Sequence, residues 1–191
     1  MELVLASQSP RRHELLRTIG VGFRVRPAAV DESWSPGEDP IAYVERIARL
    51  KADTVFAAIG AARDVCVLAA DTTVDLDGEI LAKPDDDDDA RRMLQAMSGR
   101  THQVHTHVVG RTVAGARAVT VTTGVTFVEL DDAAISWYLG FGEHADKAGA
   151  YGMQGAAAAL VERIDGSPSN VIGLPLAETI DVLRASGVPI R

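Results

Sequence analysis

The stretch Leu3-Val-Leu-Ala-Ser7-Gln-Ser9-Pro10-Arg11-Arg12 indicates how this chain begins to fold. Its apolar start has the length of a short strand, and the apolar residues after Arg12 recur at helical spacing (Leu15, Leu16 and Ile19). Ser9 is a favourable N-cap, and Pro10 suits the first helical position because no backbone N–H is needed there. The stretch therefore predicts a strand, a tight turn and a helix in direct succession.

Arg11 and Arg12 fall in the first turn of that helix, where the free N–H groups already carry positive partial charge. Two cations in this position call for an anion. The backbone amides, the hydroxyls of Ser7 and Ser9 and both guanidiniums can converge on one phosphate chain. The alternative is that both arginines are solvated surface residues.

Composition places the chain among ordinary globular proteins of about one domain. It has 191 residues, 47% of them apolar, and a formal net charge of -8. An acidic chain is a poor match for a nonspecific nucleic-acid or membrane surface, although the run from Asp85 to Asp89 supplies five of the negative charges. The single cysteine, Cys66, lies in an apolar stretch, so no disulfide can form within the chain and Cys66 is not expected to be a nucleophile. With no basic and apolar leader and no run of about 18 apolar residues, we expect a cytoplasmic protein.

The next segments predict a short strand over 23–27, a loop over 31–39 that carries Glu32, and a long helix. Asp39 is the expected N-cap of the helix and Pro40 its first residue. Lys51 interrupts the apolar stripe of this helix, so its stem should be packed while its ammonium reaches a partner. The alternative is a lysine that extends to solvent. The stripe consists of Ile41, Val44, Ile47, Ala48, Val55 and Ile59.

A buried strand is expected over 65–70, ending at Asp71-Thr72-Thr73, with a hairpin over 74–81 turning at Asp77-Gly78. A carboxylate at the end of a buried strand is a frequent place for catalytic or metal-binding acids in α/β proteins. The alternative for Asp71 is a turn or helix cap.

The acidic run 85–89 is expected to form the first turn of a helix through Met97, where negative charge suits the helix dipole. Consecutive carboxylates on a helix point in different directions, which disfavours a metal cage. Strands are expected over 103–109 and 118–128. His102, His105 and His107 suggest zinc, but only the last two share a strand face and no other ligand cluster accompanies them, so zinc is disfavoured.

The segment 143–155 should be an ordered loop, because it mixes glycines with polar and apolar residues without a regular period. Lys147 can neutralise charge, Tyr151 can stack, and Gln154 can read a base edge through its amide. The alternative is that these are generic loop residues. Another helix is expected over 131–139, and the chain should end in an amphipathic helix over 176–183.

Together these motifs resemble the Maf family of nucleoside triphosphate pyrophosphatases over nearly the whole chain. The motifs are Ser7-Gln-Ser-Pro-Arg-Arg12, Glu32, Lys51, Asp71-Thr72, Lys83-Pro84, Asp146-Lys-Ala-Gly-Ala-Tyr-Gly-Met-Gln-Gly155 and Asn170-Val-Ile-Gly-Leu-Pro-Leu176. The resemblance implies one α/β domain over 1–191, with a twisted mixed β-sheet flanked by helices and a cleft between two lobes, akin to the inosine triphosphate pyrophosphatases.

The resemblance also implies hydrolysis of a nucleoside triphosphate to monophosphate and pyrophosphate, with Mg²⁺ or Mn²⁺, which would keep non-standard nucleotides out of nucleic acid. It implies that Asp71 is the proton acceptor and that Glu32 and Asp71 hold the metal. The residues tied to substrate specificity are Arg11, Thr72 and Gln154, and those expected to bind phosphate are Ser7, Ser9, Arg12, Lys51 and Lys83. On this basis Lys51→Met should fold well but lose triphosphate affinity.

Asp71-Thr72 and the Gly-Ala-Tyr-Gly-Met-Gln loop resemble the branch of the family that acts on dTTP and UTP, with modified pyrimidine triphosphates as further candidates. Asp75 and Ser167-Pro-Ser169 depart from the usual pattern and weaken the assignment of the base. The alternatives are the 7-methyl-GTP branch and a noncatalytic nucleotide-binding regulator, since the family is linked to septum formation. A homodimer stays open, and neither nucleic acid nor a membrane is expected as a partner.

Overall fold

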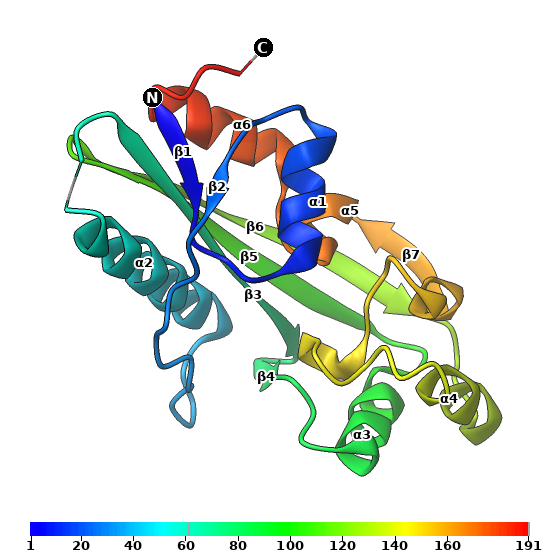
Figure 1. Cartoon of the computed structure of the whole chain (residues 1–191). Coiled ribbons are helices and arrows are strands. Elements are labelled where there is room, and N and C mark those ends of the chain that lie inside the picture. The colour runs from blue at the N-terminus through cyan, green and yellow to red at the C-terminus, as the bar shows by residue number, and fades with distance from the viewer. Residues whose placement is uncertain (61, 191) are drawn as a thin grey trace.

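A mixed β-sheet forms the centre of the computed structural model, which describes residues 1–60 and 62–190 (Figure 1). Across these residues the sheet has seven strands in the order β2-β1-β3-β5-β6-β7, with β4 paired to β3. β1 lies parallel to β2 and β3, and the other pairs are antiparallel. The strands are β1 (Glu2–Leu5), β2 (Arg24–Val25), β3 (Val65–Leu76), β4 (Glu79–Leu81), β5 (Thr101–Thr112), β6 (Gly115–Phe127) and β7 (Val161–Asp165).

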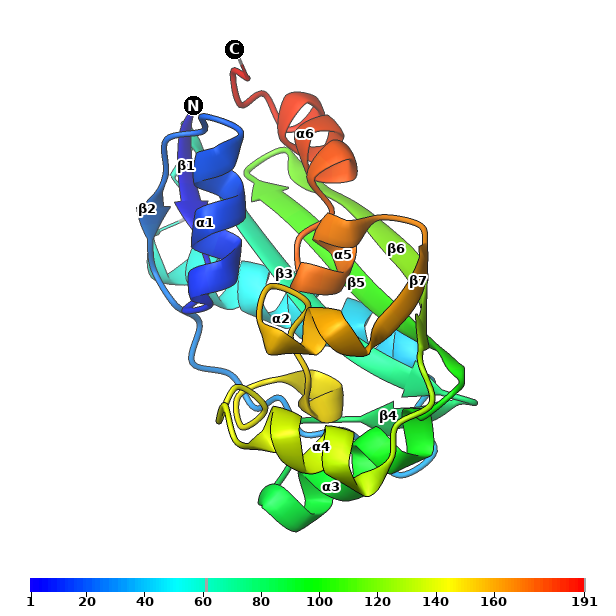
Figure 2. The ribbon, with the colours of Figure 1, turned by 90° about the vertical axis from the view of Figure 1, so that its right-hand side faces the viewer.

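Helices cover both faces of this sheet, which confirms the predicted α/β class (Figures 1 and 2). α2 packs on one face, while α1, α5 and α6 lie on the other, and α3 and α4 gather at one end of the sheet. The helices are α1 (Pro10–Thr18), α2 (Pro40–Ala58), α3 (Asp87–Met97), α4 (Asp132–Leu139), α5 (Pro168–Ile172) and α6 (Leu176–Ala185), with 3₁₀ turns η1 (Ala148–Ala150) and η2 (Ala156–Leu160).

Side-chain alternation along β3 explains how one strand serves both layers. Val67 and Ala69 join the apolar cluster under α2, whereas Leu68 and Ala70 join the cluster shared with α1 and α6. Successive residues of a strand point to opposite faces, so a near-continuous apolar run is required where both faces are covered. The predicted domain range 1–191 also includes residues 61 and 191, which lie outside the described residues.

A third apolar cluster forms a second lobe around the far ends of the long strands. Val74, Val104 and Phe127 pack there against Leu94 of α3 and Tyr138 of α4. β3 and β5 run through both lobes, so the lobes are joined by continuous hydrogen-bonded strands. The cleft therefore lies between the two lobes, where polar residues separate their apolar clusters.

The expectation that a buried strand ends at Asp71 is wrong. β3 continues through Asp71 to Leu76, because β5 pairs with it without interruption from Val67 to Asp75. What changes near Asp71 is the other edge of β3. There the pairing with β1 ends at Leu68 and the pairing with β4 begins at Val74. Between these two pairings, over residues 69–73, this edge of β3 pairs with neither β1 nor β4. Side chains from both faces of β3 can therefore line the cleft at this point.

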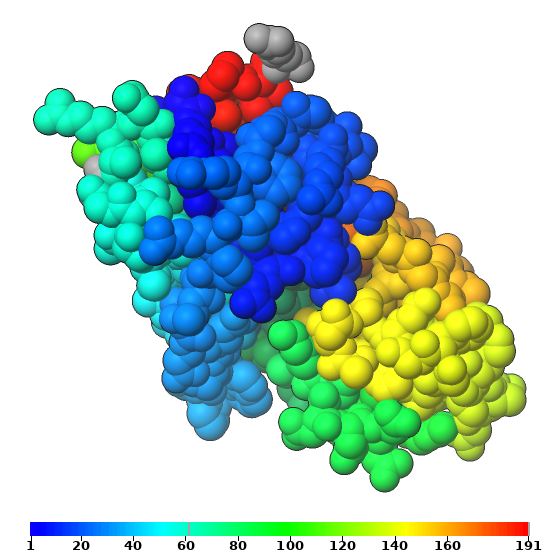
Figure 3. Space-filling model, viewed as in Figure 1, coloured from blue at the N-terminus to red at the C-terminus, as the bar shows by residue number. Residues whose placement is uncertain are grey.

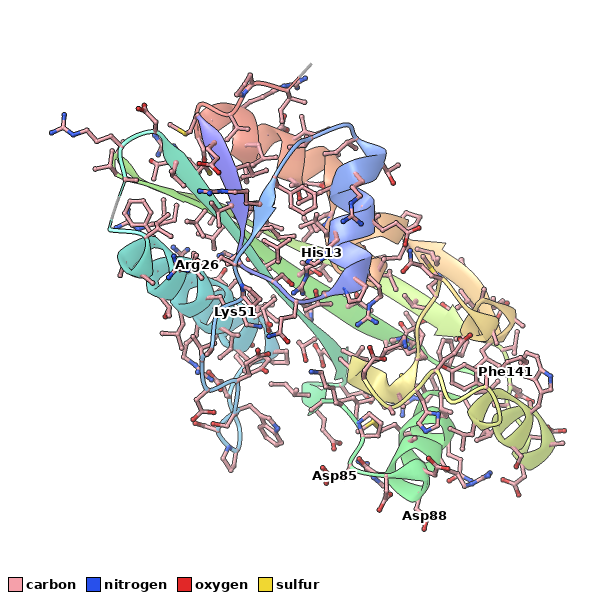
Figure 4. All side chains as sticks on the ribbon, viewed as in Figure 1. His13, Arg26, Lys51, Asp85, Asp88 and Phe141 are labelled. Carbon is pink, nitrogen blue, oxygen red and sulfur yellow. The ribbon has the colours of Figure 1, made fainter. Side chains whose placement is uncertain are left out.

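The predicted helix starts are largely confirmed. Asp39 accepts a hydrogen bond from the Ala42 N–H at 2.9 Å, and Asp86 caps α3 with three more acidic residues in its first turn. Asp131 caps α4 in the same way. Asp85 and Asp88 lie at the outside of the molecule (Figure 4), so the acidic run is a solvated cap.

Two predictions are wrong, those for Ile41 and for the side chain of Ser9, and two observed elements were not predicted. Ile41 is 39% exposed, so it does not belong to the buried stripe of α2. Ser9 occupies the N-cap position of α1, but its side chain makes no capping bond; its N–H instead donates to Ser7 Oγ at 3.1 Å. β7 and α5 were not expected, since both are five residues long and carry a weak periodic signal.

The three histidines of β5 each bond to a side chain of a neighbouring segment. His102 bonds to the hydroxyl of Tyr151, and His105 and His107 bond to Thr122 and Thr120 of β6. Cys66 is fully buried, and burial raises the pKa of its thiol to about 11, as expected for an unreactive cysteine. Among the described helices, none has the length and apolar character needed to cross a bilayer.

Candidate active site

A cavity of about 410 Å³ opens between the two lobes, where the space-filling surface is hollowed next to the N-terminal segment (Figure 3). Its lining comes from the turn before α1, from α2, from β3 and from the loops on either side of η1. All ten residues predicted from the sequence line this cavity: Ser7, Ser9, Arg11, Arg12, Glu32, Lys51, Asp71, Thr72, Lys83 and Gln154. The structure thus brings them together, while the individual roles stay predictions.

Lys51 ends between two carboxylates. It extends from α2 toward β3 (Figure 4), and its Nζ lies 2.8 Å from Asp71 Oδ1 and 2.9 Å from Glu32 Oε2. Lys51 is only 7% exposed and Asp71 only 5%. The interpretation of Lys51 as a lysine that extends to solvent is therefore wrong. The face of α2 that packs on the sheet carries this ammonium into the cleft.

Burial and neighbouring charges have opposite effects on the pKa of Asp71. Burial raises the pKa of its carboxyl, while the charges of Lys51 and Arg12 and the hydrogen bond from Lys51 lower it. Burial is the larger effect, so the pKa lies above the ordinary range for aspartate. A carboxylate with a raised pKa takes up a proton more readily, which suits a general base.

Arg12 is held from the protein side by three groups. Its Nε donates to the carbonyl of Gly173 at 2.8 Å, and its Nη2 donates to Thr72 Oγ1 at 3.0 Å. Its Nη1 lies 3.4 Å from Ser7 Oγ. Burial lowers the pKa of the guanidinium and the charge of Asp71 raises it. Arg12 is therefore a fixed cation of the cleft, and the solvated alternative is wrong for it.

Arg11 reaches across the cleft to the other lobe. Its Nη1 donates to Asp146 Oδ2 at 3.1 Å, and Lys147 Nζ donates to Asp146 Oδ1 at 2.6 Å and also to the carbonyl of Glu143. The stem of Lys147 lies against Gly152, where a Cβ would come within 2.5 Å of Lys147 Cε. Glycine at 152 thus makes room for this lysine, and Asp146 joins two cations from different lobes.

Sequence reasoning missed several residues that hold the site together. Thr106 and Asn170 are fully buried behind Thr72, and the hydroxyl of Tyr43 donates to the carbonyl of Glu32 at 2.9 Å. Asp146 and Asn170 were noted only as parts of motifs, with no role of their own. Thr106 stands between His105 and His107 in a strand with many polar residues, so its sequence context gave no signal. Tyr43 gave none, because nothing local distinguishes it from an ordinary helix-surface tyrosine.

The donor set can be tested against a divalent cation. Within residues 1–60 and 62–190, no cluster of three or more His, Cys, Asp or Glu side chains is arranged to hold a metal. However, Asp71 and Glu32 already converge on one positive centre, and Lys51 contacts only one oxygen of each. Mg²⁺ is often held by one or two carboxylates, with substrate phosphates and water completing the shell. The pair therefore fits a cation that arrives with a phosphate ligand.

The charge of the cleft differs from that of the whole chain. Five of the lining side chains are cationic and three are anionic, an excess of two positive charges in a protein of net charge -8. An electropositive recess in an acidic protein attracts anions locally. The cations are Arg11, Arg12, Lys51, Lys83 and Lys147, and the anions are Glu32, Asp71 and Asp146.

Residues 2–186 match the family model described as Maf-like protein. The chain belongs to the Maf family. This Maf-family chain is 54% identical to a protein of Anaeromyxobacter dehalogenans strain 2CP-1 named dTTP/UTP pyrophosphatase, over 98% of this chain and 95% of that protein. It is 48% identical to proteins of the same name from Hahella chejuensis and Myxococcus xanthus, in each case over 98% of this chain and 94% of the relative.

Two solved structures overlap with the chain in part. The Staphylococcus aureus Ham1 protein has 17% identity and a TM-score of 0.49, covering 66% of this chain and 72% of that one. A Mycobacterium abscessus protein described as nucleoside-triphosphatase / dITP/XTP pyrophosphatase has 15% identity and a TM-score of 0.44, covering 68% and 76%.

Proposed function

We propose that this Maf-family protein is a nucleoside triphosphate pyrophosphatase that hydrolyses dTTP and UTP to the monophosphate and pyrophosphate. The observation that carries the proposal is the electropositive cleft with one buried carboxylate, Asp71, at its centre. Relatives about half identical over almost their whole length, named dTTP/UTP pyrophosphatase, support the choice of substrates.

The chemistry follows from the charges in the cleft. A water molecule attacks the α-phosphorus, its proton passes to the Asp71 carboxylate, and the bond from the α-phosphorus to the bridging oxygen breaks. Pyrophosphate leaves with the electron pair of that bond. Positioned cations lower the barrier because negative charge grows on the departing oxygens, and Arg12, Lys51 and Lys83 are the candidates.

Glu32 and Asp71 are the proposed holders of Mg²⁺ or Mn²⁺. A divalent cation would neutralise phosphate charge and orient the phosphate chain. Lys51 then has a clear task in this chain: it keeps the two carboxylates next to each other at 2.8 and 2.9 Å from its Nζ. Tyr43 supports the same arrangement, since it binds the backbone of Glu32.

The base would lie against the loop that follows Asp146. Gln154 can pair with a base edge through its amide, and Arg11 and Thr72 are the other proposed specificity residues. The ring of Tyr151 is fixed, because its hydroxyl lies 2.7 Å from His102 Nε2. Burial lowers the pKa of His102 to about 4, so this partner stays neutral at ordinary pH.

Product analysis tests the proposal directly. The wild type and Asp71→Asn would be incubated with dTTP, UTP, CTP, GTP, 7-methyl-GTP and modified uridine triphosphates in Mg²⁺ or Mn²⁺. We expect monophosphate and pyrophosphate from dTTP and UTP, with the activity lost in the variant. Turnover of 7-methyl-GTP alone would assign the chain to the other branch. Binding without turnover would favour a noncatalytic regulator of septum formation.

We also propose that the reaction takes place in the cytoplasm. The single cysteine is buried and unpaired, which is typical of proteins in a reducing compartment.

A further inference from the structure

We propose that Thr106 is a positioning residue: its hydroxyl orients the hydroxyl of Thr72, which in turn holds the Arg12 guanidinium toward the phosphate site. The three side chains form a connected row that begins at Thr106 of β5 and ends in the cleft. The inference rests on the proposed function for its effect on turnover, but not for its effect on the binding of an anion.

The sheet places the two threonines opposite each other. Thr72 of β3 and Thr106 of β5 are a direct cross-strand pair, and their Oγ1 atoms lie 2.9 Å apart. They occupy the face of β3 opposite the one that carries Asp71, next to α5. Thr106 is fully buried, so its hydroxyl has no contact with bulk solvent. The pair interrupts the apolar layer between the two lobes.

The available donors and acceptors decide which hydroxyl of this row donates to which. The Thr106 hydroxyl donates its only proton to the carbonyl of Asn170 at 3.1 Å, and a carbonyl can only accept. Thr72 must then donate to Thr106. In the opposite arrangement Thr72 would donate to the carbonyl of Gly173 at 3.5 Å, which is too long for a good hydrogen bond. The first arrangement leaves the Thr72 oxygen as an acceptor facing Arg12.

Arg12 completes the row, because a guanidinium can only donate. Its Nη2 donates to Thr72 Oγ1 at 3.0 Å and its Nε to the Gly173 carbonyl at 2.8 Å. Two of its three nitrogens are therefore held by hydrogen bonds of 3.0 Å or less, and the third, Nη1, by the longer contact with Ser7. The edge that carries Nη1, 3.4 Å from Ser7 Oγ, is the part of the guanidinium nearest the phosphate-binding turn.

The far end of the row is anchored in the sheet. Asn170 is fully buried, and its Nδ2 donates to the carbonyl of Val104 at 2.9 Å and to Thr123 Oγ1 at 3.0 Å. α5, which carries Asn170, leads directly to Gly173 at its C-cap. One short helix thus supplies both the acceptor for Thr106 and the carbonyl for Arg12. Because the Thr72 proton is committed to Thr106, Thr72 acts on the substrate through Arg12 rather than by donating to it.

Thr106→Val is the decisive variant, since valine keeps the shape and removes the hydroxyl. We expect the affinity for inorganic pyrophosphate, measured by calorimetry, and kcat/KM for dTTP each to fall about tenfold, the size of one lost hydrogen bond. Thr106→Ser should restore both to within about twofold. Thr112→Val is the matched control: it removes another buried threonine hydroxyl of β5 that donates to a carbonyl, that of Gly115 at 3.2 Å, and should leave both values unchanged.

A double-mutant cycle separates positioning from general packing. In an Arg12→Gln background, Thr106→Val should cause little further loss of pyrophosphate affinity, because both changes act through the same guanidinium. Thr106→Ala serves as a second variant if valine lowers the yield of folded protein. Wild-type affinity in Thr106→Val, equal losses in both backgrounds, or failure of serine to rescue would each overturn the proposal. If dTTP is not a substrate, turnover is absent in every variant, whereas the pyrophosphate measurements still decide this inference.

Discussion

Lys51→Met tests how the buried charges of the cleft depend on one another. Methionine has a similar unbranched shape and can fill the space of the lysine stem between α2 and the sheet. What the change removes is the ammonium that lies 2.8 Å from Asp71 Oδ1. Lys51 and Asp71 are 7% and 5% exposed, so both charges are largely removed from bulk water.

The structure therefore predicts a cost that the sequence alone did not suggest. Removing one member of a buried ion pair destabilises a protein by about 3–5 kcal/mol. The lower end, about 3 kcal/mol, applies here because the charge of Arg12 still acts on Asp71. The contact with Glu32 adds little, since that side chain is 46% exposed. For a domain of this size, about 3 kcal/mol corresponds to a Tm lower by roughly 6–12 °C.

The cost should depend on pH with a definite sign. Without the positive charge of Lys51, which lowers the pKa of Asp71, that pKa rises further above its unfolded value. When the folded pKa of a group exceeds its unfolded pKa, the unfolding free energy of the protein decreases as the pH rises through that interval. The difference in unfolding free energy between wild type and variant should accordingly be largest near neutral pH and shrink on acidification. Asp71→Asn in the Lys51→Met background should recover most of it.

Urea unfolding at pH 7.5 and pH 5 measures these free energies, and calorimetry with dTTP measures the expected loss of affinity. Lys83→Met is the matched control for stability: it removes one cationic side chain from the same cleft, but Lys83 is exposed. Its unfolding free energy should stay within about 0.5 kcal/mol of wild type. Equal stability of Lys51→Met and wild type at pH 7.5, or no recovery in the double variant, would refute the reasoning.

Asp71→Asn should lower kcat by about 10²–10⁴-fold, the usual contribution of a general base, and should also lower Tm, since it leaves the Lys51 ammonium without its buried carboxylate partner; a wild-type kcat would contradict the assignment of Asp71 as the base. In wild type, kcat/KM should fall on acidification with an apparent pKa above the ordinary aspartate value of about 3.9, and unfolding free energy should decrease as the pH rises over the same interval, because the folded state holds the proton more tightly. A pH–rate profile with its acid limb at or below about 3.9 would exclude Asp71 as the base. Gly152→Ala should raise KM for dTTP several-fold, because the added Cβ would lie 2.5 Å from Lys147 Cε and force that side chain to move. Gly124→Ala is the control and should leave KM unchanged, because its Cβ would meet no atom closer than 3.6 Å.

Local signals carried much of the fold prediction. The N-cap Asp39 could be placed because a capping carboxylate bonds an N–H only two or three residues further along the chain, and the acidic residues at 85–89 and 131–132 marked the starts of two more helices. The long strands β5 and β6 were recognisable from their Val and Thr content. The length of β3 was not, because its polar residues from Asp71 onward resemble a turn until β5 is present to pair with them.

The candidate site divides in a similar way. Lys51 was recognised because a lysine in an apolar stripe is a local contradiction, but its partner could not be named from spacing. Thr106 looked like an ordinary strand residue and Asn170 was noted only as part of a motif. The hydrogen bonds that join Asn170 to Thr106 and Thr106 to Thr72 are seen only in the structure. A local pattern can indicate that a side chain needs a partner, whereas identifying the partner requires the packing of distant segments.

The amino-acid sequence by itself determined the helices with strong caps, the apolar faces that must be covered, and the set of charged residues suited to a phosphate ligand. These depend on interactions within a few residues, which the order of the chain fully specifies. The tertiary structure alone decided that Asp71 lies mid-strand against Lys51, that Arg11 reaches Asp146 and that Arg12 is held through Thr72. Those contacts join residues 20 to 135 positions apart, and they arise only when two lobes pack around one shared sheet.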